Sequence, residues 1–254
     1  MARLPSVFIS HGSPMHALDP GAAGEAWAEL GRRLGKPRAI LIASAHWETN
    51  VPMLTGNPKP ETIHDFSGFP QPLYKLRYPA PGAPDVAQRA QALLKDAAID
   101  GSRGLDHGAW APLLYMYPKA DIPVVQISVQ PAFGPRHHVE VGRSLKNLSE
   151  EGVLIIGSGH MTHNLRDWAR GSGKPQPYAR EFRDWVREKM EKRDLEALAD
   201  YRSLAPHAAR AHPTEEHFLP LFFALGASGH QGNPERIYDG IEGGVLAMDS
   251  YVFH

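Results

Sequence analysis

Four short apolar runs, rich in β-branched residues, constrain the fold of this chain more than any other feature. They are SVFIS (6–10), AILIAS (39–44), IPVVQIS (122–128) and VLIIG (153–157). Continuous apolar runs of this length are typical of strands that are covered on both faces. Amphipathic helical patterns separate the runs, and strands that alternate with helices form a mostly parallel sheet with right-handed crossovers. We therefore predict an α/β fold with a mostly parallel central sheet flanked by helices.

The segments outside these runs predict the rest of the architecture. Residues 178–200 form a charged helix with an apolar stripe, and the final segment VLAMDSYVF (245–253) alternates and adds a strand. The stretch 50–82 is rich in proline and aromatic residues and has no clear period. It is predicted to be a long ordered loop or a small hairpin excursion, and loops of that length are usually functional. We find no internal repeat and no interdomain linker, so residues 1–254 are expected to form a single domain.

Composition excludes several classes of function. The net charge is -1, which gives no general attraction to nucleic acid or anionic lipid. The chain has no cysteine, and this excludes disulfides, thiolate metal sites and cysteine nucleophiles. No apolar stretch approaches the roughly 20 residues that span a bilayer. We therefore expect a cytoplasmic protein with a small-molecule substrate and with no nucleic acid or membrane partner.

The 14 histidines are the unusual feature of the composition, and several of them follow predicted strands. His11 follows the first strand and His46 follows the second, whereas His160 and His163 both follow VLIIG. Ligands of an open parallel sheet bind in the crevice outside the carboxyl ends of its strands. A single histidine at a strand end is more often a hydrogen-bonded loop residue than a ligand. Several that converge on one crevice favour a metal site.

A further histidine lies in HPTEEHFLPLFFALGA (212–227). Thr214 is a candidate helix cap, which would place His217 in the first helical turn. Pro220 fits such a helix only if the helix begins late or bends there.

The other histidines fall into three groups. His212 is predicted to orient its neighbours, and His64 and His107 fit either loop packing or a place beside the site. The remaining six are predicted to lie at the surface, and they are His16, His137, His138, His207, His230 and His254.

Six motifs together resemble the LigB-like superfamily of extradiol ring-cleaving dioxygenases, and within it the DODA-type branch (4,5-DOPA extradiol dioxygenase-like). They run in family order over almost the whole chain, and they are FISHGSPMHAL, SAHWET, IHDFSGFPQPLYKLRYPAPG, LDHGAWAPLLYMYP, GSGHMTHNL and HPTEEHFLPLFFALGA. The resemblance implies one catalytic domain over residues 1–254 and a mononuclear non-haem metal at the strand ends.

The resemblance also implies roles for individual residues. His11, His46 and His217 would be metal ligands, and His163 would be the acid/base group beside the metal. His160 would lie close enough to join the coordination sphere, and His107 would face the pocket for substrate and oxygen. With three protein ligands an octahedral ion keeps three free positions, which a catechol and O₂ together require. His160 is therefore expected to detach when substrate arrives or to act without binding the metal.

The sequence leaves two alternatives for the identity of the metal, iron(II) and zinc. Related ring-cleaving enzymes use a carboxylate as the third ligand, which is the set associated with iron(II). Here His217 stands in that place, with Glu215 and Glu216 beside it. An all-imidazole set suits zinc at least as well as iron(II). We expect one mononuclear divalent metal, Fe(II) for turnover or Zn(II) as bound.

The loop HDFSGFPQPLYKLRYPAPG (64–82) is predicted to form the substrate wall. His64, Phe69 and Tyr74 are the candidate substrate-binding residues, and Phe66 is a further aromatic candidate. Lys75 or Arg77 could meet a substrate carboxylate. The alternative is that this is a proline-anchored packing loop with solvated charges.

The resemblance predicts an extradiol dioxygenase that opens a DOPA-like or caffeate-like catechol with O₂. The alternative is a zinc-dependent hydrolase in which the same histidine site activates water. A third possibility is a non-catalytic metal-binding protein, which the complete histidine set argues against. An oligomer is possible.

Overall fold

The structure is a computed structural model, and it describes residues 3–170, 173–229 and 233–254. Its centre is a sheet of strands in the order β4-β3-β5-β2-β6-β1-β10-β7. The pairs β5·β2, β2·β6 and β6·β1 are parallel, whereas β10 lies antiparallel to both β1 and β7. The predicted fold class, a single α/β domain with a mostly parallel central sheet, is therefore confirmed.

The strands are β1 Ser6–Ser10, β2 Ala39–Glu48, β3 Met53–Thr55, β4 Ala98–Asp100, β5 Val124–Val129, β6 Val153–Gly159, β7 Pro234–Tyr238, β8 Ile241–Glu242, β9 Leu246–Ala247 and β10 Ser250–Phe253. The α-helices are α1 Gly21–Leu34, α2 Gln71–Lys75, α3 Pro84–Leu93, α4 His107–Met116, α5 Gly134–Leu145, α6 Leu165–Arg170, α7 Pro177–Glu191, α8 Leu195–Ala199, α9 Tyr201–Leu204, α10 Ala208–Ala211 and α11 Leu219–Ser228. Short 3₁₀ helices cover η1 Pro14–Ala17, η2 Pro131–Phe133 and η3 Lys146–Ser149.

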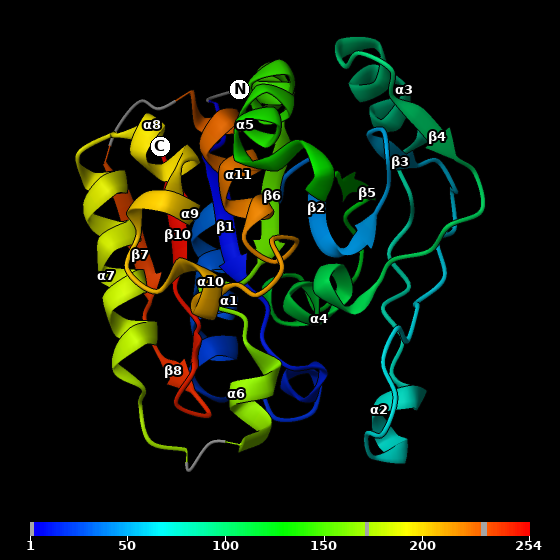
Figure 1. The fold of residues 1–254 in the computed structure, drawn as a ribbon. Helices are drawn as coiled ribbons and strands as arrows, with labels where there is room; N and C mark the ends of the chain where they lie inside the picture. Colours follow the sequence, from blue (N-terminus) through cyan, green and yellow to red (C-terminus); the bar gives the residue numbers. More distant parts are fainter. Residues whose placement is uncertain (1–2, 171–172, 230–232) are drawn as a thin grey trace.

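Helices cover both faces of the parallel strands, which explains why those strands are apolar throughout (Figure 1). Ile40 and Ile42 of β2 belong to the core beneath α1 and α4. Leu41 points to the opposite face, into the core shared with α5 and α11. The central strands are consequently buried on both sides, and the chemistry of the sheet is confined to the strand ends.

The segment 50–82 departs from the predicted loop in one respect. Its residues 53–55 form β3, which joins the sheet between β4 and β5. The rest is an ordered excursion that contains α2 and is fastened by bridges from Thr62 to Leu105 and from Gly82 to Val124. A three-residue strand gives too short a pattern to be read from sequence.

Two other boundaries differ from the prediction. The charged helix predicted over 178–200 ends at Glu191, and Asp194 caps a separate short helix, α8, by accepting a hydrogen bond from Ala197 N–H. The final segment forms two strands, β9 and β10, and only β10 joins the main sheet.

The described part of the chain contains no helix that is both long enough and apolar enough to cross a bilayer.

Candidate metal centre and its cavity

The carboxyl ends of β2, β6 and β1 lie side by side because β6 pairs with both of its neighbours in parallel register. His11 directly follows β1, His46 stands near the end of β2, and His160 follows β6. The sheet order therefore brings together side chains that are 35 and 114 positions apart in the sequence. As predicted, the histidines converge at the carboxyl ends of the parallel strands, and this edge of the sheet defines the site.

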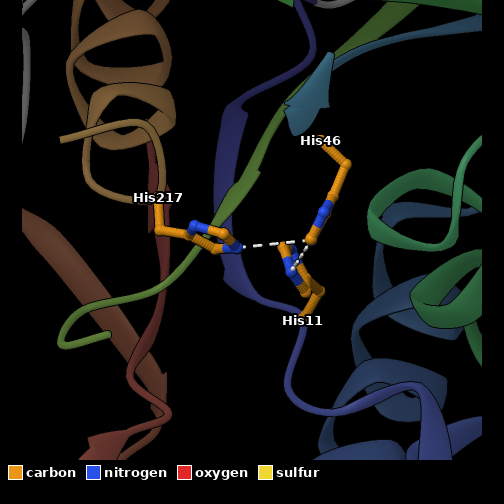
Figure 2. A group of neighbouring side chains, drawn as sticks. All are labelled: His11, His46 and His217. Carbon is orange, nitrogen blue, oxygen red and sulfur yellow. Dashed lines mark hydrogen bonds between the residues drawn. The ribbon is translucent and has the colours of Figure 1, made fainter. Parts of the chain in front are cut away.

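Three imidazoles meet at this edge (Figure 2). The Nε2 atom of His46 lies 3.1 Å from Nε2 of His11 and 3.3 Å from Nε2 of His217. These donor atoms come within 4.8 Å of one another, as the ligands of a single cation must. His11 and His217 are buried, and His46 is partly exposed. The three nitrogen atoms form a compact, all-imidazole donor set.

The surroundings keep these imidazoles neutral. Burial lowers the pKa of His11 and of His217 well below the ordinary value, and the nearby imidazoles lower it further. Burial also lowers the pKa of His46, although the Asp65 carboxylate opposes that effect. Neutral imidazole is the form that binds a metal ion, so the cluster is ready to act as a ligand set at neutral pH.

Each of the three rings has a partner on its Nδ1 side. Nδ1 of His11 lies 3.0 Å from Ser158 Oγ, whose hydroxyl donates to the carbonyl of Gly108. Nδ1 of His217 lies 2.9 Å from Glu216 Oε1. The partner on the side of His46 is Asp65, with its Oδ2 atom 3.4 Å from Nδ1. Partners of this kind fix the tautomer that leaves Nε2 free for a metal.

His217 reaches the site from a turn and not from the first turn of a helix, so that prediction was wrong. Helix α11 begins at Leu219 with Pro220 in its first turn, where a missing N–H costs nothing. Thr214 does not cap it, and its hydroxyl instead donates to Glu216 Oε1 over 3.0 Å. The carbonyl of His217 accepts a hydrogen bond of 2.7 Å from the N–H of His160. This bond ties the turn to the end of β6.

His160 and His163 take different places around the cluster. His160 is buried with its ring centroid 4.9 Å from that of His11, and its Nδ1 is buried without a hydrogen-bond partner among the described residues. His163 stacks on the ring of His217 with centroids 3.5 Å apart. Burial lowers the pKa of His163 to about 4.

His107 stands at the start of α4, which Asp106 caps. Its ring centroid is 4.0 Å from that of His46. Asp65 holds it twice, accepting from the backbone N–H over 2.9 Å and from the Nδ1 side over 2.8 Å. Sequence reasoning missed Asp65, and its position directly after His64 in the IHDFSGFP motif was the available signal.

These groups line one cavity with a volume of about 390 Å³. Its apolar lining comes from separate segments of the chain, with Phe66 and Phe69 from one, Leu165 and Trp168 of α6 from another, and Leu246 from a third. The α6 wall was not foreseen, because an isolated six-residue helix carries little periodic signal. The full lining is His11, Gly12, Ser13, Pro14, His46, Asp65, Phe66, Phe69, His107, His160, His163, Leu165, Trp168, His217 and Leu246.

Of the predicted substrate-binding residues, Phe69 lines this cavity and two others lie behind its wall. His64 and Tyr74 pack against Phe66, with ring centroids 5.7 and 5.4 Å from it. Arg77 is exposed, and its guanidinium donates to the carbonyls of Tyr74 and Leu76. Lys75 is exposed as well, and neither cation lines the cavity.

Two of the histidines predicted to lie at the surface are buried. His16 lies between Trp27 and Glu242, and its Nε2 contacts Glu242 Oε1 at 2.8 Å. His138 accepts the N–H of Gln130 at Nε2. The partner of His16 is distant in the sequence, whereas His138 is held by the nearby Gln130 and Gly134. Local polarity was misleading for both. His212, predicted to orient its neighbours, is buried against Phe218 and contacts the carbonyl of Met161. His230 lies outside the described residues.

Comparisons with known proteins place this site in a family. Residues 5–246 match the family of the catalytic LigB subunit of aromatic ring-opening dioxygenases. Proteins named 4,5-DOPA dioxygenase extradiol are similar throughout: that of Beta vulgaris is 43% identical, covering 97% of this chain and 95% of the relative, and that of Escherichia coli K12 is 40% identical, covering 97% and 93%. A crystal structure of an uncharacterised Escherichia coli K12 protein superposes with a TM-score of 0.86 at 35% identity, covering 99% of this chain and 100% of that one.

The chain belongs to the LigB family of aromatic ring-opening dioxygenases. The predicted enzyme class is confirmed, and the coordinating cluster at the strand ends provides a place for the mononuclear metal that the family uses.

Proposed function

We propose that this protein is an extradiol dioxygenase that opens a catechol ring at a metal held by His11, His46 and His217. The observation that carries the proposal is the convergence of three neutral Nε2 atoms, within 4.8 Å of one another, at the floor of an aromatic-walled cavity. The names of the similar proteins support a DOPA-like catechol, and a caffeate-like catechol is the alternative of the same class. Residues 1–254 form the catalytic domain in this proposal.

The donor set fits a divalent metal. Three imidazoles that all present Nε2 to one point, two of them buried and each with a partner on its Nδ1 side, form a typical site for Fe(II) or Zn(II). When bound, Fe(II) would bring catechol and O₂ together and pass electron density between them, whereas Zn(II) has no redox chemistry. We therefore propose Fe(II) for turnover, with Zn(II) able to occupy the same ligands.

The remaining histidines would handle protons and shape the pocket. His163 is neutral and lines the cavity beside the ligand cluster, so its imidazole is placed to accept a proton from a catechol hydroxyl. His107 lines the same cavity. Nδ1 of His160 has no hydrogen-bond partner in the described part of the chain, and His160 is the candidate fourth, detachable ligand. These roles are inferred from the positions of the side chains, and each can be tested by mutation.

The cavity supports an aromatic substrate. The rings of Phe66 and Phe69 are inclined by 78°, with centroids 5.3 Å apart, and offer both a ring face and a ring edge. Leu165 and Trp168 add a further apolar wall. A planar ring would lie between these walls with its two oxygens directed to the histidine cluster.

Reconstitution with defined metals tests the proposal. Apo-protein is loaded anaerobically with Fe(II) or with Zn(II), catechols are added, and O₂ uptake and a yellow ring-fission product are followed. The proposal predicts uptake with Fe(II) only. No uptake with any catechol, together with ester or amide hydrolysis in the zinc form, would replace it with the hydrolase alternative.

Three further expectations stay predictions. They are a cytoplasmic location, the absence of nucleic-acid and membrane partners, and a possible oligomer.

A further inference from the structure

Asp65 is the one acidic side chain that lines the cavity among the described residues. Its Oδ1 atom accepts the backbone N–H of His107 over 2.9 Å. Its Oδ2 atom lies 2.8 Å from Nδ1 of His107 and 3.4 Å from Nδ1 of His46. A single carboxylate thus faces two imidazoles of different function.

We propose that Asp65 is a positioning residue that sets one tautomer on both His46 and His107. The inference rests on the proposed metal-binding role of His46. An ionised carboxylate can only accept hydrogen bonds, so it requires Nδ1–H on His107, which it bonds at 2.8 Å, and favours Nδ1–H on His46 at 3.4 Å. Both Nε2 atoms are then left with a free lone pair. On His46 that lone pair faces the other two ligand histidines.

On His107 the same arrangement has a different consequence. The ring lines the cavity, so its Nε2 becomes a hydrogen-bond acceptor for a hydroxyl of the bound substrate. Without Asp65 the ring could present either nitrogen as donor. The same carboxylate therefore makes Nε2 of His107 a hydrogen-bond acceptor and leaves Nε2 of His46 free to bind a metal.

Asp65 also fixes the wall that holds the aromatic ring. It precedes Phe66, and its bond to the N–H of His107 fastens that part of the loop to the first turn of α4. The loop has anchors of its own nearby: Ile63 N–H donates to Leu105, and the indole of Trp110 donates to the carbonyl of Ile63. A substitution at Asp65 should accordingly leave the fold in place and act on the two imidazoles.

The first test measures tautomers in the apo-protein, without any metal or substrate. Two-dimensional ¹⁵N–¹H multiple-bond spectra at pH 8 distinguish Nδ1–H from Nε2–H imidazoles. The wild-type protein should show Nδ1–H at both His46 and His107. In Asp65→Asn the amide NH₂ becomes a donor, and Nε2–H signals should appear at both rings. An Nε2–H form at either ring in the wild-type protein would overturn the proposal, and this reading does not depend on how the variant behaves.

The second test measures the affinity for Zn²⁺ by competition with a chromophoric chelator. Loss of an outer partner of a ligating histidine typically costs about 10–100-fold in affinity, and Asp65→Asn should fall in that range. Glu216→Gln serves as the matched comparison, because it should weaken Zn²⁺ binding through His217 while leaving the His107 spectrum unchanged. Asp85→Asn, an exposed carboxylate paired with Arg38, should change neither reading. Unchanged affinity and tautomers in Asp65→Asn would refute the inference.

Turnover gives the third reading and separates this inference from the proposed function. Rates of Asp65→Asn are expressed per bound iron, and kcat should stay about 10-fold or more below the wild-type value after metal loss has been corrected. Full recovery of kcat per bound iron would contradict the assigned effect on His107. If the wild-type protein itself opens no catechol, the proposed function fails, whereas the tautomer and affinity readings still decide the role of Asp65.

Discussion

The imidazole ring of His163 stacks on that of His217, with centroids 3.5 Å apart and planes inclined by 13°. His163 is held there by its backbone, since its N–H donates to the carbonyl of Ala211 over 2.8 Å. The two rings reach the cavity from different parts of the chain, one after β6 and the other before α11. The proposed proton acceptor therefore lies directly against a candidate metal ligand, and the two roles can be separated by mutation.

Replacing His163 or His217 with alanine should affect the metal content differently. His163→Ala should retain the metal and lose turnover by about 100-fold or more, because the proposed proton acceptor is gone. His217→Ala should sharply lower metal occupancy, because one of three ligands is lost. Metal analysis of the purified variants, with O₂ uptake beside it, checks both. Metal loss in His163→Ala, with full occupancy in His217→Ala, would exchange the two assignments.

Glu216 should tune the metal through the ring it supports. Its Oε1 atom lies 2.9 Å from His217 Nδ1 and also accepts from the Thr214 hydroxyl. Glu216→Gln can still accept the Nδ1–H bond but removes the charge, so Zn²⁺ affinity should fall by roughly 10-fold. Glu216→Ala removes the bond as well and should cost more. Equal affinities for both variants and the wild-type protein would show that this carboxylate does not act on the metal.

Metal binding should also stabilise the fold. At a Zn²⁺ concentration of 100 times Kd, linkage predicts a gain in the free energy of unfolding of about 2.7 kcal/mol. Thermal denaturation of the apo-protein with and without Zn²⁺ measures the gain. The same addition should leave the melting temperature of His11→Ala nearly unchanged. An equal rise in that variant would place the bound zinc elsewhere.

The sequence predicted those parts of the molecule whose signal is local. Apolar β-branched runs specified the strands, and the histidines that follow three of the four runs specified the edge at which the cluster forms. His217 was found, but its turn was mistaken for a helix, because the contacts that hold it there come from β6. Leu165 and Trp168 were missed because the six-residue α6 carries little periodic signal. Asp65 was missed although it directly follows His64 in the IHDFSGFP motif. The burial of His16 was missed because its partner Glu242 lies 226 residues away. His138 is one of the buried residues of α5, and its polar partners Gln130 and Gly134 are local.

Gly159, the last residue of β6, should be intolerant of even a methyl group. A Cβ atom at this position would overlap the carbonyl of His217, which is the acceptor that ties the turn to the sheet. Gly159→Ala should lower the free energy of unfolding by about 1–3 kcal/mol and also weaken Zn²⁺ binding. Gly101→Ala is the control, because nothing lies within 4 Å of its added Cβ. Denaturant unfolding and metal titration measure both effects, and a fully stable Gly159→Ala with wild-type affinity would contradict the close packing.

Asp249 predicts how stability depends on pH. Burial raises the pKa of this carboxyl from 3.8 to about 7, although Arg183 and Arg236 oppose the shift. Its Oδ2 atom is buried without a hydrogen-bond partner among the described residues, and the side chain of Arg183 is 3.9 Å away. Between pH 4 and 7 the folded state therefore holds a proton that the unfolded state has already lost.

It follows that this group makes stability fall as pH rises through that window, by at most about 4 kcal/mol at 1.36 kcal/mol per pKa unit. The isosteric Asp249→Asn carries no titrating group, so its free energy of unfolding should fall less steeply between pH 4 and 7. Urea denaturation of both proteins at pH 5, 6, 7 and 8 measures the difference. Because the folded wild-type protein must ionise this buried group above pH 7, the variant should gain most in relative stability at pH 8. Parallel pH profiles for the two proteins would mean that Asp249 is ionised throughout the window and is stabilised by its two arginines.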